Sequence, residues 1–227
     1  MASAIDVCNT ALARIGQVGN VASIDPPEGG AISEACSIFL PIAVQEMLES
    51  FPYSFACRRA TVALLTEKPI GYRYAYRLPA DCLRVLDLLK GEEQLDDEDY
   101  PYSTVISEGE YGFPLHGRGD TRWDVEAIDG VPSLLTYVKI DAVRYLSGKT
   151  NVGMFTATAA DALAWLVASK LAGALLGGDA GAKMAQNCLQ FYNATEQQAI
   201  SLGLQRQNKV LFYRSPFVDS FIGGQNA

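Results

Sequence analysis

Several residue types and motifs on which catalytic centres commonly depend are scarce or missing from this sequence. It contains one histidine, His116, so a metal site built from several histidines is excluded. The closest two of its five cysteines, Cys36 and Cys57, are 21 residues apart, which leaves no CxxC pair and no zinc-finger spacing. No GxSxG nucleophile motif and no GxxxxGK(S/T) or GxGxxG phosphate-binding motif occurs. We therefore expect no catalytic residues, no metal and no cofactor, and we expect the cysteines to be free thiols.

Positive charge and long apolar runs are also in short supply. Lys and Arg total 18 against 26 Asp and Glu, which gives a net charge of −8. Because proteins grip nucleic acid through clustered Lys and Arg, a nucleic-acid-binding module is not expected. The start of the chain has no basic, apolar signal peptide, and its most apolar window, 159–176, is interrupted by Asp161 and Lys170. We expect a soluble protein made in a cytoplasm.

The two ends of the chain carry helical periodicity. Ser3 is predicted to cap a helix that runs to about Ile15, where Gly16 ends it. A second helix is predicted from about Ala31 to Ser50, with paired apolar positions that make a stripe wide enough for packing on two sides. Pro41 should kink this helix or mark a late start.

Two more helices are predicted near the C-terminus. The first begins at about Thr156, with a buried face formed by Leu163, Leu166, Val167, Leu171 and Ala174. Gly177 and Gly178 end it, and Asp179 can cap the next helix, which is predicted to run to about Leu202. In this last helix, the residues predicted to face the protein core are Met184, Cys188, Phe191, Thr195, Gln198 and Leu202. A short loop between two long helices favours antiparallel packing.

The middle of the chain has strand patterns instead. Tyr72, Tyr74 and Tyr76 alternate with other residues as in an extended segment, and Cys82–Leu88 is a second strand candidate. A hairpin is predicted from Trp123–Ala127 and Ser133–Ile140, around the turn pair Asp129-Gly130. The fold class is therefore α+β, mainly α. We expect an antiparallel helical bundle from residues 1–60 and 145–203, an inserted β-rich domain over 61–144 and an extended C-terminal tail over 204–227.

Two segments are candidates for contacts with partners. Six carboxylates lie within eight residues: Glu92, Glu93, Asp96, Asp97, Glu98 and Asp99. A solvated turn explains this cluster, and a divalent-ion site or a functional negative surface are the alternatives. The tail combines basic and apolar residues without a helical or strand period, which suggests docking onto a partner. Its candidate docking residues are Arg206, Lys209, Leu211, Phe212, Tyr213, Arg214, Phe217 and Phe221.

Three segments, in this order, resemble one protein family. Residues 5–16 have the sequence IDVCNTALARIG, residues 50–60 have SFPYSFACRRA, and residues 74–86 have YAYRLPADCLRVL. A looser fourth match contains Tyr137, Phe155 and the Ala/Leu-rich segment that follows. Together they are similar to the tail tubular protein A family, the head-to-tail adaptors of short-tailed bacteriophages. The chain departs from the family pattern at Tyr53, where a Trp is usual, and residues 91–120 and the tail align with nothing in it.

The resemblance implies a structural virion protein of the phage tail rather than an enzyme. It implies a homo-oligomeric, dodecameric ring bound under the portal protein, joined to the tail nozzle protein and in some cases to tail fibres. Genomic DNA would pass through the ring without sequence-specific binding, and no membrane would be involved. The acidic cluster is a candidate to line the wall of this channel. The alternative is a soluble enzyme or small-ligand-binding domain whose site has no recognisable motif.

Overall fold

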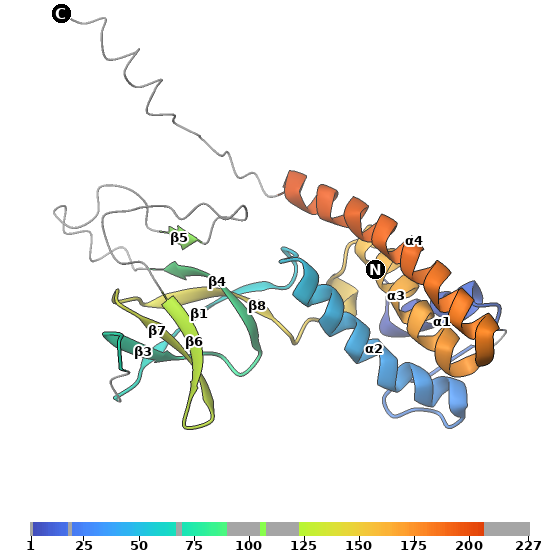
Figure 1. Cartoon of the computed structure of the whole chain (residues 1–227), viewed down its shortest axis with the longest axis horizontal. Coiled ribbons are helices and arrows are strands. Elements are labelled where there is room, and N and C mark those ends of the chain that lie inside the picture. Colours follow the sequence, from blue (N-terminus) through green and yellow to red (C-terminus); the bar gives the residue numbers. More distant parts are fainter. Residues whose placement is uncertain (1, 18–19, 67–69, 90–104, 108–122, 207–227) are drawn as a thin grey trace, which may run out of the picture.

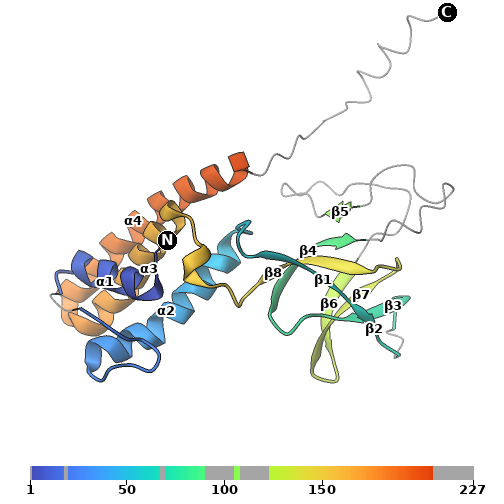
Figure 2. The ribbon, with the colours of Figure 1, turned by 180° about the vertical axis from the view of Figure 1, so that it is seen from behind.

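The computed structural model describes residues 2–17, 20–66, 70–89, 105–107 and 123–206 (Figure 1). Within these residues the chain is α+β, with helices at one end of the molecule and strands at the other (Figure 1; Figure 2). The helices come from the two sequence ends of this described region, and the strands come from its middle. We refer to these as the helical part and the β-rich part.

The two N-terminal helices begin where the sequence predicts, the first of them at a side-chain cap. The first helix, α1 (Ala4–Arg14), starts after Ser3, whose hydroxyl accepts a hydrogen bond from the Asp6 amide while the Asp6 carboxylate accepts one from the Ser3 amide. This reciprocal pair satisfies two amides at a helix start that have no partner within the helix. The second helix, α2 (Ala31–Ser50), is continuous through Pro41. The alternative of a late helix start at Pro41 is therefore wrong.

The third helix, α3 (Ala157–Leu175), is the central element of the helical part. It follows a short 3-10 turn (Val152–Met154), is capped by the Thr156 hydroxyl, and packs against α1, α2 and α4 (Figure 1). Leu163, Leu166, Val167 and Leu171 are fully buried, as predicted, whereas Ala174 is exposed near the end of the helix. Many of the other buried positions of α3 are alanines, which let neighbouring helices approach closely.

The last helix, α4 (Gly178–Arg206), differs from prediction in its length and in its buried face. It continues through Gly203 to Arg206, so residues 204–206 are helical and do not belong to an extended tail. Phe191 is 54% exposed and Leu202 is 39% exposed, and Gln198 is also exposed, so half of the predicted stripe points outward. The inward side is instead centred on Cys188, Tyr192, Glu196 and Ala199. A buried carboxylate is the physical reason for the error, because Glu196 was not expected on the inward face.

The described strands form two four-stranded antiparallel sheets, with orders β1-β8-β4-β5 and β2-β3-β7-β6. Their bounds are β1 (Cys57–Thr61), β2 (Ala63–Leu64), β3 (Tyr74–Arg77), β4 (Cys82–Leu89), β5 (Val105–Ser107), β6 (Trp123–Ile128), β7 (Val131–Thr136) and β8 (Ala142–Ser147). Side chains of both sheets, among them Tyr76, Leu88, Leu134 and Tyr145, bury one shared hydrophobic core. The β-rich part is thus two small sheets packed on each other.

The β6–β7 hairpin matches its sequence signal. Asp129 and Gly130 adopt φ values of 50° and 77° and connect the two strands directly. Both residues of such a tight turn need positive φ, which Asp tolerates and Gly adopts without strain. The second strand of the hairpin ends at Thr136, earlier than predicted.

Two strands connect the helical and β-rich parts. Strand β1 follows α2 after a short aromatic linker, and β8 precedes α3. They pair antiparallel, from Cys57↔Leu146 to Thr61↔Ala142. The boundaries expected at 60/61 and 144/145 fall inside these strands, so each strand belongs as a whole to the β-rich part.

Candidate functional site

Nearly all of the residues proposed from sequence as sites lie outside the described part of the chain. This applies to the acidic cluster from Glu92 to Asp99, to His116 and to the tail residues from Lys209 to Phe221. Arg206 is described only as the last residue of α4. These predictions therefore stay untested, and other candidate sites come from the described surfaces.

The outward side of α4 is unusual because most of its length, after Lys183, carries no charge. Between Lys183 and Arg206 the helix has one charged residue, Glu196, and that residue is buried. The exposed positions in this interval are amides, small residues and the half-exposed apolar residues Leu189, Phe191, Leu202 and Leu204. We call this exposed side, from Met184 to Leu204, the α4 face. Depletion of charge together with exposed aromatic and aliphatic side chains is the composition of a protein interface core.

The aromatic residue on the α4 face is held by a stack that crosses three helices. Phe191 stacks on Trp165 of α3, with ring centroids 4.7 Å apart. The Arg14 guanidinium of α1 lies 3.9 Å from the centroid of the Trp165 ring and is ion-paired with Asp161. A cation over an indole ring is a favourable contact, and it fixes the ring on which Phe191 rests. The exposed ring of Phe191 is therefore presented on a rigid support.

A second apolar surface lies on α2. Ile38 is 57% exposed and Ile42 is 50% exposed, and Pro41 between them is also exposed. Glu34, Gln45 and Glu49 are exposed on the same side, because positions three and four residues apart share one face of a helix. We call these six residues the α2 face. It has an apolar centre with acidic ends, and α2 contains no Lys or Arg.

A buried polar cluster connects α2 to α4. The Glu196 carboxylate oxygen Oε1 accepts hydrogen bonds from the Tyr192 hydroxyl at 2.5 Å and from the Ser50 hydroxyl at 2.6 Å. Tyr53 lies nearby, and its buried hydroxyl has no hydrogen-bond partner among the described residues. Burial raises the pKa of both Tyr53 and Tyr192, and the Glu196 charge raises them further. These groups are oriented toward each other rather than toward solvent, so the cluster fixes two helices and exposes no reactive atom.

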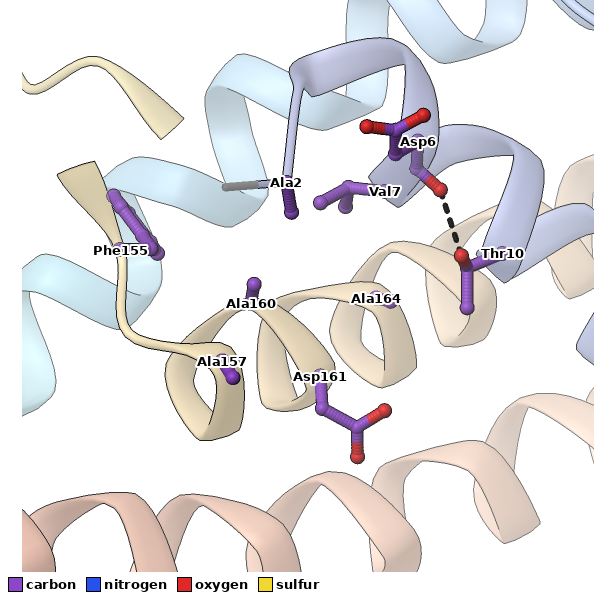
Figure 3. Close-up of a pocket in the computed structure, with 9 residues that line it drawn as sticks. All are labelled: Ala2, Asp6, Val7, Thr10, Phe155, Ala157, Ala160, Asp161 and Ala164. Carbon is purple, nitrogen blue, oxygen red and sulfur yellow. Dashed lines mark hydrogen bonds between the residues drawn. The ribbon is translucent and has the colours of Figure 1, made fainter. Parts of the chain in front are cut away.

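A shallow groove of about 450 Å³ lies between the N-terminal turns of α1 and α3 (Figure 3). Its lining is mostly apolar, and its two carboxylates, Asp6 and Asp161, stand at the rim. The Asp6 carboxylate already accepts from the Ser3 amide, and Asp161 is paired with Arg14. The Ser3 amide and hydroxyl hold the pKa of Asp6 below its usual value. The groove could admit a small apolar group, and its acidic atoms are already engaged in the fold.

The polar network of the β-rich part joins neighbouring strands to one another. Asp81 accepts hydrogen bonds from Ser147 at 2.6 Å and from Tyr145 at 3.2 Å, and Arg58 lies at 3.5 Å. The Ser147 hydroxyl is the main cause that lowers the pKa of Asp81. Across the same sheet, Arg144 pairs with the buried Asp87 at 2.9 Å. The Ser147, Tyr145 and Arg144 contacts join β8 to β4 or to its leading turn, and Arg58 links β1 to that turn, so together they fix strand register.

Reactive or metal-binding groups do not converge within the described ranges. No group of three or more His, Cys, Asp or Glu residues that could hold a metal ion occurs there. All five cysteines are free, as expected. The thiol of Cys36 and burial raise the pKa of Cys8, and burial raises the pKa of Cys82 to about 11. Thiols with raised pKa values are poor nucleophiles at neutral pH.

Among the helices that the structure describes, α2 and α3 are long and apolar enough to cross a membrane by length and composition alone. The core helix of a soluble protein meets the same criterion. Both contribute inward-facing residues to the core shared by the four helices.

Sequence reasoning missed both helix faces. The signal for the α4 face was present as a run of uncharged residues between Lys183 and Arg206, interrupted by one Glu. The signal for the α2 face was the two-sided apolar stripe, of which the structure leaves one side exposed. The chain matches no protein-family model and no curated protein sequence.

Proposed function

We propose that this protein is a structural component of a bacteriophage tail. It would form a ring that acts as a head-to-tail adaptor, joining the portal protein to the tail nozzle and enclosing the path of the DNA. This proposal starts from the resemblance of residues 5–16, 50–60 and 74–86 to the tail tubular protein A family. The described fold is compatible with it, because helices precede and follow a β-rich middle.

The α4 face is the observation that carries the proposal. A long helix whose exposed side has no charge from Met184 to Leu204, with Leu189 along one edge and Phe191 along the other, is suited to burial against another protein. The α2 face, at another place on the same helical part, provides a second apolar surface of different composition. Two different surfaces on one subunit permit a heterologous, head-to-tail contact, which closes into a ring when the rotation per subunit is right.

The finer architecture belongs to the same proposal. We infer that α1, α2, α3 and α4 act as one antiparallel bundle that builds the ring, with the β-rich part inserted between α2 and α3. Residues 207–227 would dock onto a neighbouring subunit or the portal through the tail residues listed above. The acidic cluster from Glu92 to Asp99 would contribute negative charge to the DNA path, where repulsion lets DNA slide without adhering.

The proposal is tested by measuring assembly of the purified full-length protein, alone and with a portal protein, by mass measurement and electron microscopy. We expect rings, or a complex that forms when the portal is added. Introducing charge on the α4 face by Phe191→Glu or Leu189→Lys should abolish these species. Val125→Lys is the matched control, because Val125 is 43% exposed and lies on β6, far from that face.

The alternative function makes a different prediction in the same measurements. A small-ligand-binding protein would remain monomeric with or without the portal, and the α1–α3 groove is one place where the described residues could admit a ligand. Saturable binding of a small molecule that the substitution Ala160→Leu abolishes would favour this alternative.

Under the ring proposal, removal of residues 207–227 should leave the monomer's thermal transition nearly unchanged and prevent stable attachment to the portal.

A further inference from the structure

The α2 face is a surface without a covering element within the described part of the chain. Its centre, Ile38 and Ile42, is half exposed on a helix most of whose other apolar positions are buried in the shared core or packed against it. Large exposed apolar surface on a folded domain usually marks a site of interaction. The apolar stripe of α2 is wide enough for two partners, and the structure provides a partner for one side of it.

The chemistry of the α2 face defines what can cover it. The exposed carboxylates Glu34 and Glu49 lie at its two ends, and Gln45 donates a hydrogen bond to Glu49 at 3.0 Å. Glu46, at the edge, is paired with Lys170. With no basic residue on α2, the face favours a segment that combines apolar side chains with positive charge.

The sequence of the C-terminal segment, residues 207–227, has this combination. It contains Phe212, Phe217 and Phe221 together with Lys209 and Arg214, against a single acidic residue, Asp219. Aromatic anchors flanked by basic residues would place rings on Ile38 and Ile42 and charges near Glu34 and Glu49.

The direction in which the chain leaves α4 favours the α2 face of another copy over the segment's own. Gly203, in the last turn of α4, lies against the ring of Phe51, just after the C-terminal end of α2. The two helices point the same way there, so the chain leaves α4 beyond the end of α2 and away from Ile38 and Ile42 (Figure 1). The segment has 21 residues and spans at most about 70 Å when extended, enough to reach an adjacent molecule. A copy packed on the α4 face would lie next to this exit point.

We propose that the α2 face is the acceptor for the C-terminal segment of an adjacent copy of this chain. The inference rests on the proposed function, because it assigns one of the contacts that would close the ring. The contact is heterologous, with the segment of one subunit on the α2 face of the next. Each subunit therefore donates one segment and accepts another.

A complementation experiment with full-length chains tests this contact. One variant, Ile42→Lys, has a defective α2 face and an intact segment, and the other, Phe217→Asp, has an intact face and a defective segment. Each alone should lose ring formation, with self-association weakened by at least about tenfold. Mixed together, they should form a one-to-one pair and nothing larger, because one good contact remains per pair. Val125→Lys should assemble as the unchanged protein does, and circular dichroism should show all variants folded.

Charge reversal gives an independent measurement. Glu49→Lys should weaken assembly, and Arg214→Glu on the same chain should restore it, since every subunit then carries both changes. Rings formed equally well by Ile42→Lys would overturn the contact on α2 and leave the ring proposal standing. Failure of the two variants to pair when mixed would also overturn the contact on α2. A dimer that Phe217→Asp still forms and Ile42→Lys does not would overturn it as well, because such a dimer would join two α2 faces. An unchanged protein that never associates would overturn both proposals.

Discussion

The buried cluster between α2 and α4 allows one chemical change to be made at two neighbouring sites with opposite expected results. Tyr192 and Tyr53 are both buried, and both lie near Glu196. The Tyr192 hydroxyl donates to Glu196 at 2.5 Å, whereas the Tyr53 hydroxyl has no partner among the described residues. Replacement of either by Phe removes one oxygen atom and keeps the ring.

The two substitutions should differ in unfolding free energy because of that one bond. A hydrogen bond to a charged group contributes about 1.5–3 kcal/mol, so Tyr192→Phe should destabilise by about that amount. Ser50 remains bonded to Glu196, which keeps the loss from being larger. Burial of an unpaired hydroxyl is unfavourable, so Tyr53→Phe should be neutral or should stabilise by about 1 kcal/mol.

Urea unfolding at neutral pH, followed by the helical signal at 222 nm, measures both variants against the unchanged protein. For a chain of this size, a loss of 1 kcal/mol corresponds to a fall in Tm of about 2–4 °C, so thermal unfolding should separate them too. In a Glu196→Gln background the cost of Tyr192→Phe should shrink, because the acceptor is no longer charged. A loss of more than about 1 kcal/mol for Tyr53→Phe would refute the assignment of an unpaired hydroxyl.

Three other predictions concern the folded subunit. Burial raises the pKa of Tyr53 and Tyr192, so as pH rises these tyrosines lose their protons in the unfolded chain before they do so in the folded one. The free energy of unfolding should therefore fall as pH rises above about 10. Absorbance at 295 nm should show that these two tyrosines ionise only on unfolding. Leu163→Ala removes a fully buried side chain from α3 and should cost about 2–5 kcal/mol in chemical unfolding, and a loss below about 0.5 kcal/mol would place it at the surface. The native protein should react slowly with a thiol reagent and give five reactive thiols after denaturation without reduction, whereas a smaller number would indicate a disulfide.

Local signals were sufficient to predict the starts of α1 and α3 and the hairpin turn, whereas α4 begins at Gly178, one residue before the predicted cap Asp179. Ser3 and Thr156 cap α1 and α3 because their side chains satisfy amides that have no partner in the first turn. Asp129 and Gly130 specify a two-residue turn because few other pairs accept positive φ at both positions. These features depend on residues close together in sequence, so the sequence alone contains the necessary information.

Features that depend on distant residues were predicted less well. The inward face of α4 includes Glu196, which can be buried because Ser50 and Tyr192 donate hydrogen bonds to its carboxylate. A hydrophobic pattern cannot show that compensation, since Ser50 lies 146 residues away. Strand β1 was missed because Arg58 and Arg59 obscure its alternation, although both side chains face solvent. The α2 face was missed for a similar reason, because periodicity gives the width of an apolar stripe and not which side of it finds a partner.

The pairing of β1 with β8 has a consequence for how the molecule bears tension. The helical part is attached at Cys57 and at Ser147, which lie at the same end of this strand pair. A force that separates the two parts therefore pulls β1 and β8 in one direction and loads the β8–β4 ladder lengthwise. Its hydrogen bonds run across the strands, so they resist sliding together instead of opening one after another. The Arg144–Asp87 and Ser147–Asp81 contacts add two cross-links between β8 and β4 or its leading turn. The connection between the two parts is therefore loaded in shear, and its bonds would have to break together.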